Sequence, residues 1–178
     1  MKQKKIIISE NSIKKELYDI VYSNVTVVNL LLDEGIKETD IHPDALLSYY
    51  CDYYQAQVEN GGFSQYVYNS KWKDIVNERV ANGLEKMGAV KHLAFFNKRK
   101  KAVEQIPKEK IDAFLANEYF GKKNETRDQL NFDDFFDIDE NISDLNGTWL
   151  KTHPETIILS IEDMFSAIEQ IVGHKIER

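Results

Sequence analysis

Hydrophobic residues recur at three- and four-residue steps along most of the chain, which is the spacing that places them on one face of an α-helix. After Pro43, for example, an apolar stripe continues to Val58 and stops at Asn60-Gly61-Gly62. Because glycine adopts the left-handed backbone that commonly ends a helix, this triplet predicts a helix end. Stripes of this kind predict helices over about residues 12–33, 43–59, 72–87, 90–106, 111–119 and 157–172, with a short element at 63–69. Ser12 is the predicted N-cap of the first of them.

The alternation of apolar and polar residues that marks a half-buried strand is nearly absent. Ile6 to Ile8 fit either a short strand or a frayed tail, and the tail is favoured because chain ends are commonly poorly ordered. A chain of 178 residues, of which 42% are hydrophobic, is long enough for one domain with its own core. We therefore expect an all-α fold, with a frayed tail at residues 1–10 and a compact single-domain bundle of about seven to eight helices over residues 11–178.

Cysteine usage and hydropathy indicate where the protein is located. The single cysteine, Cys51, cannot form an intrachain disulfide, so nothing points to an oxidising compartment. No stretch approaches the ~20 apolar residues of a membrane span, and the basic N-terminus lacks the apolar core of a signal peptide. These features predict a cytoplasmic protein that does not bind membranes. Cys51 lies on the apolar stripe of its helix, which predicts a buried and inert thiol.

The chain carries none of the short motifs that mark common catalytic and cofactor sites. No two of its four histidines are spaced as metal ligands, and each is expected to be structural or solvent-facing; they are His42, His92, His153 and His174. A glycine-rich phosphate loop and a nucleophile elbow are also absent. The sequence therefore predicts no metal, no cofactor and no catalytic residue, and hence a protein that is not an enzyme.

The net charge of −7 is unevenly distributed along the chain. Residues 125–144, called the acidic segment below, hold one basic and eight acidic residues, a net of −7, whereas residues 71–110 hold 11 basic and 5 acidic residues, a net of +6. The basic cluster Lys98-Arg99-Lys100-Lys101 fits nucleic-acid binding, but also a solvated helix face or an intramolecular partner for the acidic segment. Because the chain is acidic and has no longer basic stripe, we expect no direct binding of nucleic acid.

The carboxylates of the acidic segment follow a helical period. Four of them fall within about 60° of one another on a helical wheel: Asp133, Asp137, Glu140 and Asp144. The apolar residues of the same stretch lie opposite: Phe135, Ile138, Ile142, Leu145 and Trp149. The pattern predicts one amphipathic helix, or two short helices that share an apolar face, and the lack of interspersed cations favours a cationic partner. The predicted partner-binding residues are Asp133, Asp134, Asp137, Asp139, Glu140 and Asp144.

The stretch from Val58 to Asn69 contains the pattern Asn-Gly-Gly-Phe-x-Gln-Tyr, followed three residues later by Asn. Its members are Asn60, Gly61, Gly62, Phe63, Gln65, Tyr66 and Asn69. The pattern resembles the signature of a bacterial family of DNA-mimic proteins, and Asp133 to Phe136 followed by His153-Pro154-Glu155 is a looser match. The similarity runs from about residue 44 to residue 160. The resemblance implies an all-helical domain, often dimeric, and for at least one member a negatively charged face that occupies the DNA-binding surface of a transcription factor.

The motif residues also have an interpretation that does not depend on the resemblance. The glycines let the chain turn back tightly after a helix, and Phe63 anchors the returning segment in the core. The amides of Asn60, Gln65 and Asn69 then satisfy backbone groups at the two helix ends. The alternative is a polar substrate pocket lined by Asn60, Gln65 and Tyr66, in which the amides would position a substrate rather than activate it.

Three functions are compatible with the sequence. The favoured one is a non-catalytic regulator that presents an acidic surface to a basic protein partner, with mimicry of DNA toward a transcription factor as one form of it. The second is an immunity or antitoxin-type protein that neutralises a basic nuclease, and the third is an enzyme that uses the polar pocket. One helix face carries a charge per about 5.5 Å of rise, against ~3.4 Å along one DNA strand, so a mimic needs charges from other elements or from a second subunit.

Overall fold

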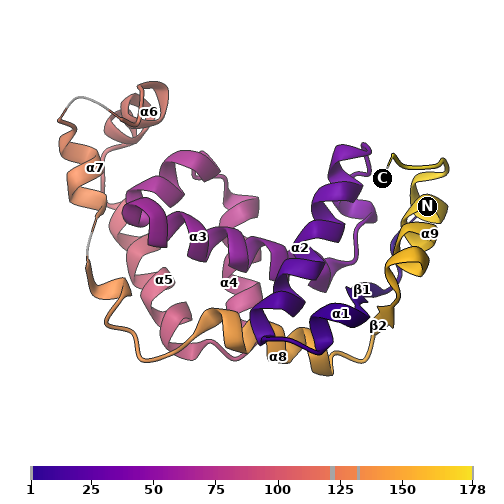
Figure 1. Ribbon diagram of the computed structural model, residues 1–178. Coiled ribbons are helices and arrows are strands. Elements are labelled where there is room, and N and C mark those ends of the chain that lie inside the picture. Colours follow the sequence, from indigo (N-terminus) through magenta and orange to yellow (C-terminus); the bar gives the residue numbers. More distant parts are fainter. Residues whose placement is uncertain (1, 121–122, 132, 178) are drawn as a thin grey trace. The chain divides into compact units, whose positions relative to one another are not determined.

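The computed structural model of the chain describes residues 2–120, 123–131 and 133–177. These residues form nine α-helices, two short 3₁₀-helices (η1 and η2) and one two-stranded sheet (Figure 1). The predicted all-α class is therefore confirmed. None of the described helices combines the length and the apolar character needed to cross a membrane.

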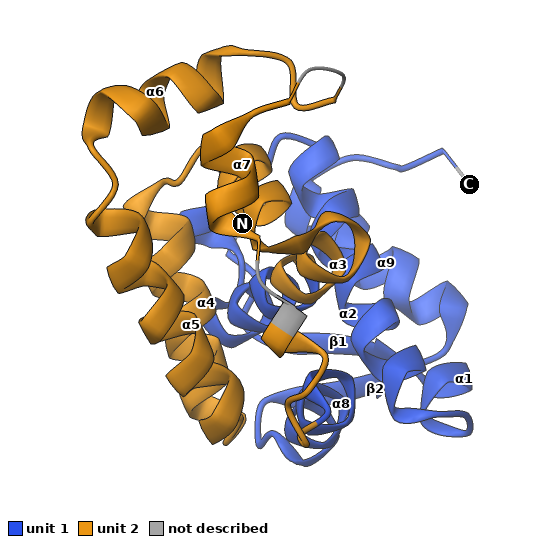
Figure 2. Ribbon diagram, turned by 90° about the vertical axis from the view of Figure 1, so that its left-hand side faces the viewer, with its two compact units in different colours: residues 1–52, 141–178 blue, residues 53–140 orange. Residues whose placement is uncertain are grey.

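The chain divides into two compact units, which Figure 2 shows in two colours. Unit 1 comprises residues 1–52 and 141–178, and unit 2 comprises residues 53–140. Unit 1 is thus built from both ends of the chain, whereas unit 2 is one continuous stretch. The single domain expected over residues 11–178 stays a prediction.

Unit 1 is organised around helix α2, which packs against α8, α9 and β1. Val28 and Leu31 of α2 are completely buried in an aliphatic core. Gly147 of α8 lets the two helices approach closely, since a Cβ atom there would lie 2.4 Å from the carbonyl oxygen of Leu17. The elements of unit 1 are β1 (Ile6–Ser9), α1 (Glu10–Ile13), α2 (Leu17–Asp33), η1 (Glu38–Asp40), the first part of α3 (Pro43–Ser70), α8 (Ile142–Thr152), β2 (Thr156–Leu159) and α9 (Ile161–Val172).

The N-terminal residues form a buried strand where the sequence predicted a frayed tail. Strand β1 pairs in parallel with β2, with Ile6 opposite Thr156 and Ile8 opposite Ile158. All four residues of β1 are buried. Because both faces of β1 are covered, its isoleucines do not alternate with polar residues, and the sequence carries no period of two. Its partner also lies some 150 residues away along the chain.

Two predicted helices are interrupted. The helix expected over residues 12–33 is split into α1 and α2, and Ser12 does not cap it. Instead the Ser9 hydroxyl caps α1 by accepting from the Ser12 N–H (3.2 Å), and Glu16 and Asp19 form a reciprocal capping box at the start of α2. The helix expected over residues 157–172 is likewise divided into β2 and α9, with Ser160 as the N-cap of α9.

Unit 2 is a helical unit with an aromatic core. The ring of Tyr54 lies 5.1 Å from that of Tyr66, 5.2 Å from that of Phe96 and 6.1 Å from that of Phe135, measured between centroids. All three pairs meet edge to face, a geometry that aromatic quadrupoles favour. Its elements are the remainder of α3, α4 (Asp74–Lys86), α5 (Val90–Glu104), α6 (Lys108–Ala116), α7 (Glu125–Leu130) and η2 (Asp133–Phe135).

Candidate functional site

The acidic segment does not form the single amphipathic helix that its pattern allowed. The turn of η2 ends at Phe135, and helix α8 starts only at Ile142. A new helix starts there because Asn141 is its N-cap, with Oδ1 accepting from the Asp144 N–H (3.1 Å). The carboxylates that coincide on the wheel therefore do not share one helix face. The side chain of Asp133 lies outside the described part of the structure.

Asp134 is bound to the basic cluster of its own unit. Its carboxylate pairs with the guanidinium of Arg99 and lies 3.5 Å from Nζ of Lys98. Arg99 is only 5% exposed, so its charge is directed inward rather than toward a ligand. From the sequence, the basic cluster fits nucleic-acid binding, a solvated helix face or pairing with the acidic segment. Lys98 and Arg99 pair with the acidic segment through Asp134.

Glu140 caps helix α5. Its carboxylate accepts from the backbone N–H groups of Lys91 (3.3 Å) and His92 (3.0 Å), the second and third residues of that helix. The N-cap residue of α5, Ala89, has no side chain that could do this. Lys91 also places Nζ 3.7 Å from the carboxylate of Asp139. Of the predicted partner-binding residues, Asp134, Asp139 and Glu140 thus contact groups within unit 2, while Asp137 and Asp144 are exposed.

The charge of each unit shows what these contacts mean for the surface. Unit 2 contains 14 basic and 15 acidic residues, a net of −1. Unit 1 contains 9 basic and 15 acidic residues, a net of −6. Most of the acidic segment lies in unit 2, where residues 71–110 offset it, so the excess negative charge belongs to unit 1.

Gly61 and Gly62 of the Asn-Gly-Gly-Phe motif turn the chain back within α3. Gly61 (φ −154°, ψ 21°) and Gly62 (φ 75°, ψ −179°) leave the helical conformation. The second part of α3, which runs to Ser70, then lies against the first part, because Nδ2 of Asn69 donates to Oε1 of Gln57 and the ring centroids of Tyr54 and Tyr66 are 5.1 Å apart. Asn131 braces this turn by accepting from the Ser64 N–H (3.0 Å), and the Tyr119 hydroxyl donates to the Gly61 carbonyl (2.9 Å). The predicted tight reversal after a helix end is therefore confirmed.

Two motif residues lie in the core of unit 2. Phe63 is 1% exposed, and Tyr66 is completely buried. The Tyr66 hydroxyl donates to Oδ1 of Asn77 (2.8 Å), which satisfies the polar end of a buried ring. Both residues follow the turn, so the turn sets the direction in which these two rings enter the core.

The amides of the motif lie at the surface of the same helix. Gln57 Oε1 accepts from Nε2 of Gln65 (3.1 Å) and from Nδ2 of Asn69 (2.5 Å), and Nδ2 of Asn60 donates to the Ala56 carbonyl (2.8 Å). A hollow of about 390 Å³ lies beside them, lined by Gln65, Tyr68, Asn69, Glu118, Tyr119 and Phe120. Asn60 and Tyr66 do not line it, so only Gln65 of the three residues predicted to form a polar pocket does so.

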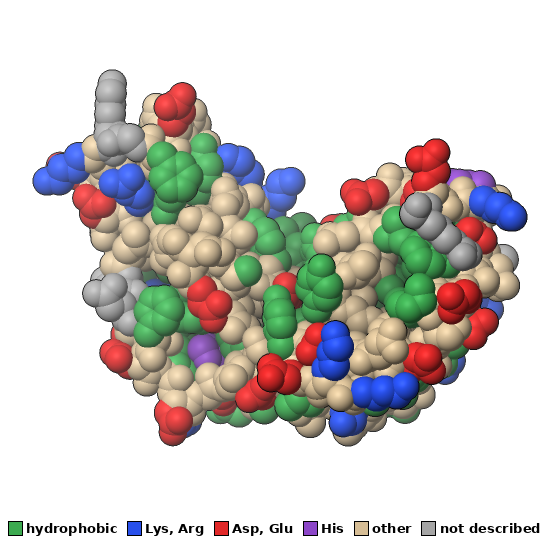
Figure 3. All heavy atoms as spheres, in the orientation of Figure 1, with side chains coloured by type: hydrophobic (Ala, Val, Ile, Leu, Met, Phe, Trp, Pro, Cys, Tyr) green, Lys and Arg blue, Asp and Glu red, His purple; other side chains and the backbone are tan. Residues whose placement is uncertain are grey.

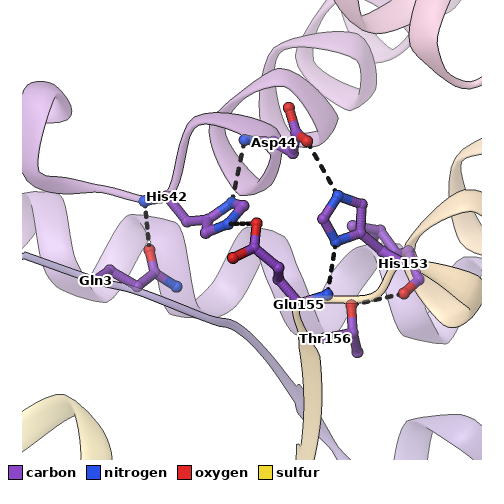
Figure 4. Close-up of polar contacts among 7 residues, drawn as sticks. Gln3, His42, Asp44, His153, Glu155 and Thr156 are labelled. Atoms are coloured by element: carbon purple, nitrogen blue, oxygen red, sulfur yellow. Dashed lines mark hydrogen bonds and ion pairs between the residues drawn. The ribbon is translucent and has the colours of Figure 1, made fainter.

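Unit 1 contains a polar cluster that the sequence analysis missed (Figure 4). It joins two His-Pro-acid tripeptides, His42-Pro43-Asp44 before and at the start of α3 and His153-Pro154-Glu155 after α8. Nε2 of His42 lies 3.1 Å from the Glu155 carboxylate, and Nε2 of His153 lies 3.0 Å from the Asp44 carboxylate. Each histidine thus contacts the acid of the other tripeptide, and the two rings meet edge to face at 5.8 Å. The repeated tripeptide was the available signal.

The hydrogen bonds of this cluster fix the state of each neutral imidazole. Nδ1 of His42 accepts from the Asp44 N–H, and Nδ1 of His153 accepts from the Glu155 N–H, both at 3.2 Å (Figure 4). In the neutral ring the proton therefore lies on Nε2, which donates to the carboxylate. Because both ring nitrogens are engaged, neither imidazole offers a nitrogen to a substrate proton. Among the described residues no group of three or more His, Cys, Asp or Glu side chains is arranged to hold a metal ion.

Cys51 is expected to be unreactive in the native protein. It is completely buried, and burial, with a smaller contribution from the Asp52 carboxylate, raises the pKa of its thiol. The nucleophilic thiolate is therefore scarce at pH 8. We expect a thiol reagent to modify native Cys51 at least about 10³-fold more slowly than the urea-unfolded chain, because reaction requires unfolding. Equal rates in the two states would contradict this burial.

Comparison with protein families identifies the chain. The model of the family described as DMP19-like protein matches residues 39–153, which is more than half of the chain and extends from η1 to the end of α8. Comparison with curated proteins and with solved structures gives no match. The resemblance to a DNA-mimic family is thus confirmed at the level of the family. The chain belongs to the DMP19-like protein family.

Proposed function

We propose that this protein is a non-catalytic regulator that presents an acidic surface to a basic protein, and that this partner is a DNA-binding protein whose DNA-binding face it occupies. Membership of the DMP19-like family supports a DNA-mimic role. The observation that carries the proposal is the uneven charge, because unit 1 holds 15 acidic against 9 basic residues. A surface with such an excess attracts cationic proteins and repels nucleic acid.

The carboxylates of the acidic segment contribute unequally to this proposal. Asp137, Asp139 and Asp144 are exposed and remain available to a partner. Asp134 and Glu140 would first have to give up their contacts with Arg99 and with the start of α5. Breaking charged hydrogen bonds of this kind opposes binding, so the exposed carboxylates are the better candidates.

A non-catalytic role agrees with the chemistry of the His-Pro-acid cluster. General base catalysis requires a nitrogen or carboxylate within hydrogen-bond reach of a substrate proton. Each imidazole of the cluster instead uses one nitrogen for a backbone N–H and the other for a carboxylate. The cluster therefore supports a role in holding α3 beside the segment that follows α8.

The proposal is tested by capture of proteins from the native host on the immobilised full chain. We expect a DNA-binding protein to be retained at about 0.05 M salt and released in a concentration-dependent manner by duplex DNA, because the two compete for one face. Affinity is expected to fall at least about tenfold between about 0.05 and 0.3 M salt. The control is an unrelated acidic protein of similar isoelectric point on the same support.

The outcomes separate the alternative functions. Retention of a nuclease whose activity is lost in the complex would support the immunity-type function instead. Retained proteins that duplex DNA does not displace, or that the acidic control retains equally, would contradict the proposal.

A further inference from the structure

A hollow of about 220 Å³ lies within unit 1, between α1, the first half of α2 and the start of α9. Tyr22 of α2 and Ile161 and Met164 of α9 contribute its apolar lining, and Lys15 and Asp19 stand at its polar side. Its volume is several times the ~30 Å³ that one water molecule occupies in the liquid. The hollow therefore has room for a side chain of another molecule.

Large apolar side chains are exposed around this hollow. Tyr22 is 61% exposed, Tyr18 49% and Ile161 42%. Tyr18 and Tyr22 are four residues apart on α2, so they lie on one face of that helix. In the view of Figure 3, hydrophobic side chains lie beside acidic ones on the part of the molecular surface where Figure 1 places α2 and α9. Exposed tyrosines beside a hollow are typical of protein-binding surfaces.

The hydroxyl groups that line the hollow already form hydrogen bonds within unit 1. The Ser23 hydroxyl accepts from the Ser9 N–H (2.9 Å), the Ser12 hydroxyl donates to the Ser9 carbonyl (2.7 Å), and that of Thr26 donates to the Tyr22 carbonyl (2.8 Å). An occupant therefore finds few polar groups in the walls that still require a partner, and its recognition must come from apolar contact and from charge.

The charge around the hollow is negative. Five acidic residues either line it or are next in sequence to a residue that lines it: Glu10, Glu16, Asp19, Glu162 and Asp163. Only two basic residues do so, Lys14 and Lys15, and Lys15 is paired with Asp19 in an exposed ion pair (3.7 Å). A ligand with Lys or Arg side chains is therefore complementary to this surface, and a nucleic acid is not.

The residues of this surface lie outside the region that the family model matches, residues 39–153. We propose that the hollow and its acidic rim are the docking surface for a Lys/Arg-bearing amphipathic segment of the basic protein partner, with an apolar side chain of that segment in the hollow. This assignment rests on the proposed function and names the surface through which it operates. The matched region then supplies the scaffold, and the segments on either side of it select the partner.

Two matched variants of the full chain test the assignment. The groove variant, Tyr22→Ala with Glu10→Gln and Glu162→Gln, removes one exposed aromatic ring and two exposed carboxylates from the docking surface. The control variant, Phe120→Ala with Glu104→Gln and Glu109→Gln, removes one exposed aromatic ring and two exposed carboxylates from unit 2, outside both the acidic segment and the docking surface. The probe is a fluorescent amphipathic peptide rich in arginine and leucine, whose affinity is measured by anisotropy at about 0.05 M salt. Circular dichroism checks that both variants remain folded.

We expect the groove variant to bind the peptide at least about tenfold more weakly than the wild type, and the control variant to change affinity less than about twofold. An unchanged affinity of the groove variant, or an equal loss in the control variant, would overturn the assignment while leaving the proposed function intact. A wild-type chain that does not bind the peptide would count against both. If the groove variant dissociates a wild-type dimer without changing the affinity for the peptide, the surface joins two copies of this chain, and the assignment is again wrong.

Discussion

Replacing Gly62 with alanine is expected to lower the free energy of unfolding by about 2–4 kcal/mol. With φ 75° and ψ −179°, Gly62 occupies a backbone region that is essentially restricted to glycine, and this strain accounts for about 1–3 kcal/mol of the loss. A Cβ atom at this position would also lie 2.4 Å from Oδ1 of Asn131. Asn131 would have to move away and abandon the Ser64 N–H, a hydrogen bond worth about 1 kcal/mol. Urea unfolding followed by circular dichroism measures the change.

Asn131→Ala is the matched control, because it removes the hydrogen bond to Ser64 without straining the backbone. It should destabilise by about 1 kcal/mol. The double variant Gly62→Ala/Asn131→Ala should be destabilised by less than the sum of the single changes, since the contact between the two positions is already absent. Wild-type stability of Gly62→Ala would show that the turn does not need this conformation.

The second large effect is expected from His42→Ala, at about 2–3 kcal/mol of unfolding free energy. The substitution empties a buried ring position, removes the acceptor for the Asp44 N–H at the start of α3, and ends the contact with Glu155. The carboxylate of Glu155 is half exposed, so it can turn to water, and the expected effect is smaller than for a fully buried ion pair.

His42→Asn separates these contributions. An asparagine at this position can again accept from the Asp44 N–H as a helix cap, so about 1 kcal/mol should be recovered relative to alanine. The control is His174→Ala, since His174 also contacts a carboxylate, that of Glu34, but is itself exposed. We expect its effect to stay below about 0.5 kcal/mol. Equal effects of His42→Ala and His174→Ala would contradict a structural role for the cluster.

Helix α3 illustrates what could be predicted from the sequence. Pro43 suits the first helical position, and the two glycines mark the place where the helical conformation is lost. Both signals are local, so both were visible. The contacts that brace this turn come from Asn131 and Tyr119, which lie far away in sequence. Residue patterns carry no information on such partners, so the sequence predicted the reversal but not the residues that brace it.

The acidic segment illustrates the same limit for the site. The sequence allowed one amphipathic helix or two short helices in this segment, and the structure has the turn of η2 followed by α8, which Asn141 caps. Residues 71–110 and most of residues 125–144 belong to unit 2. Their opposite charges offset each other there, which is not evident when each range is counted separately along the sequence. The His-Pro-acid cluster was missed because two tripeptides more than a hundred residues apart become one structure only after folding.

The pairing of β1 with β2 has a consequence for the order in which the protein is assembled during synthesis. All of unit 2 has been translated once residue 140 is added, so its aromatic core can close while the chain is still growing. Helix α2, in contrast, must wait for α8 to cover its apolar face, and β1 must wait for the last forty residues to supply β2. Unit 2, which is encoded in the middle of the chain, is therefore completed first during synthesis. Unit 1, which carries the excess negative charge, is completed last.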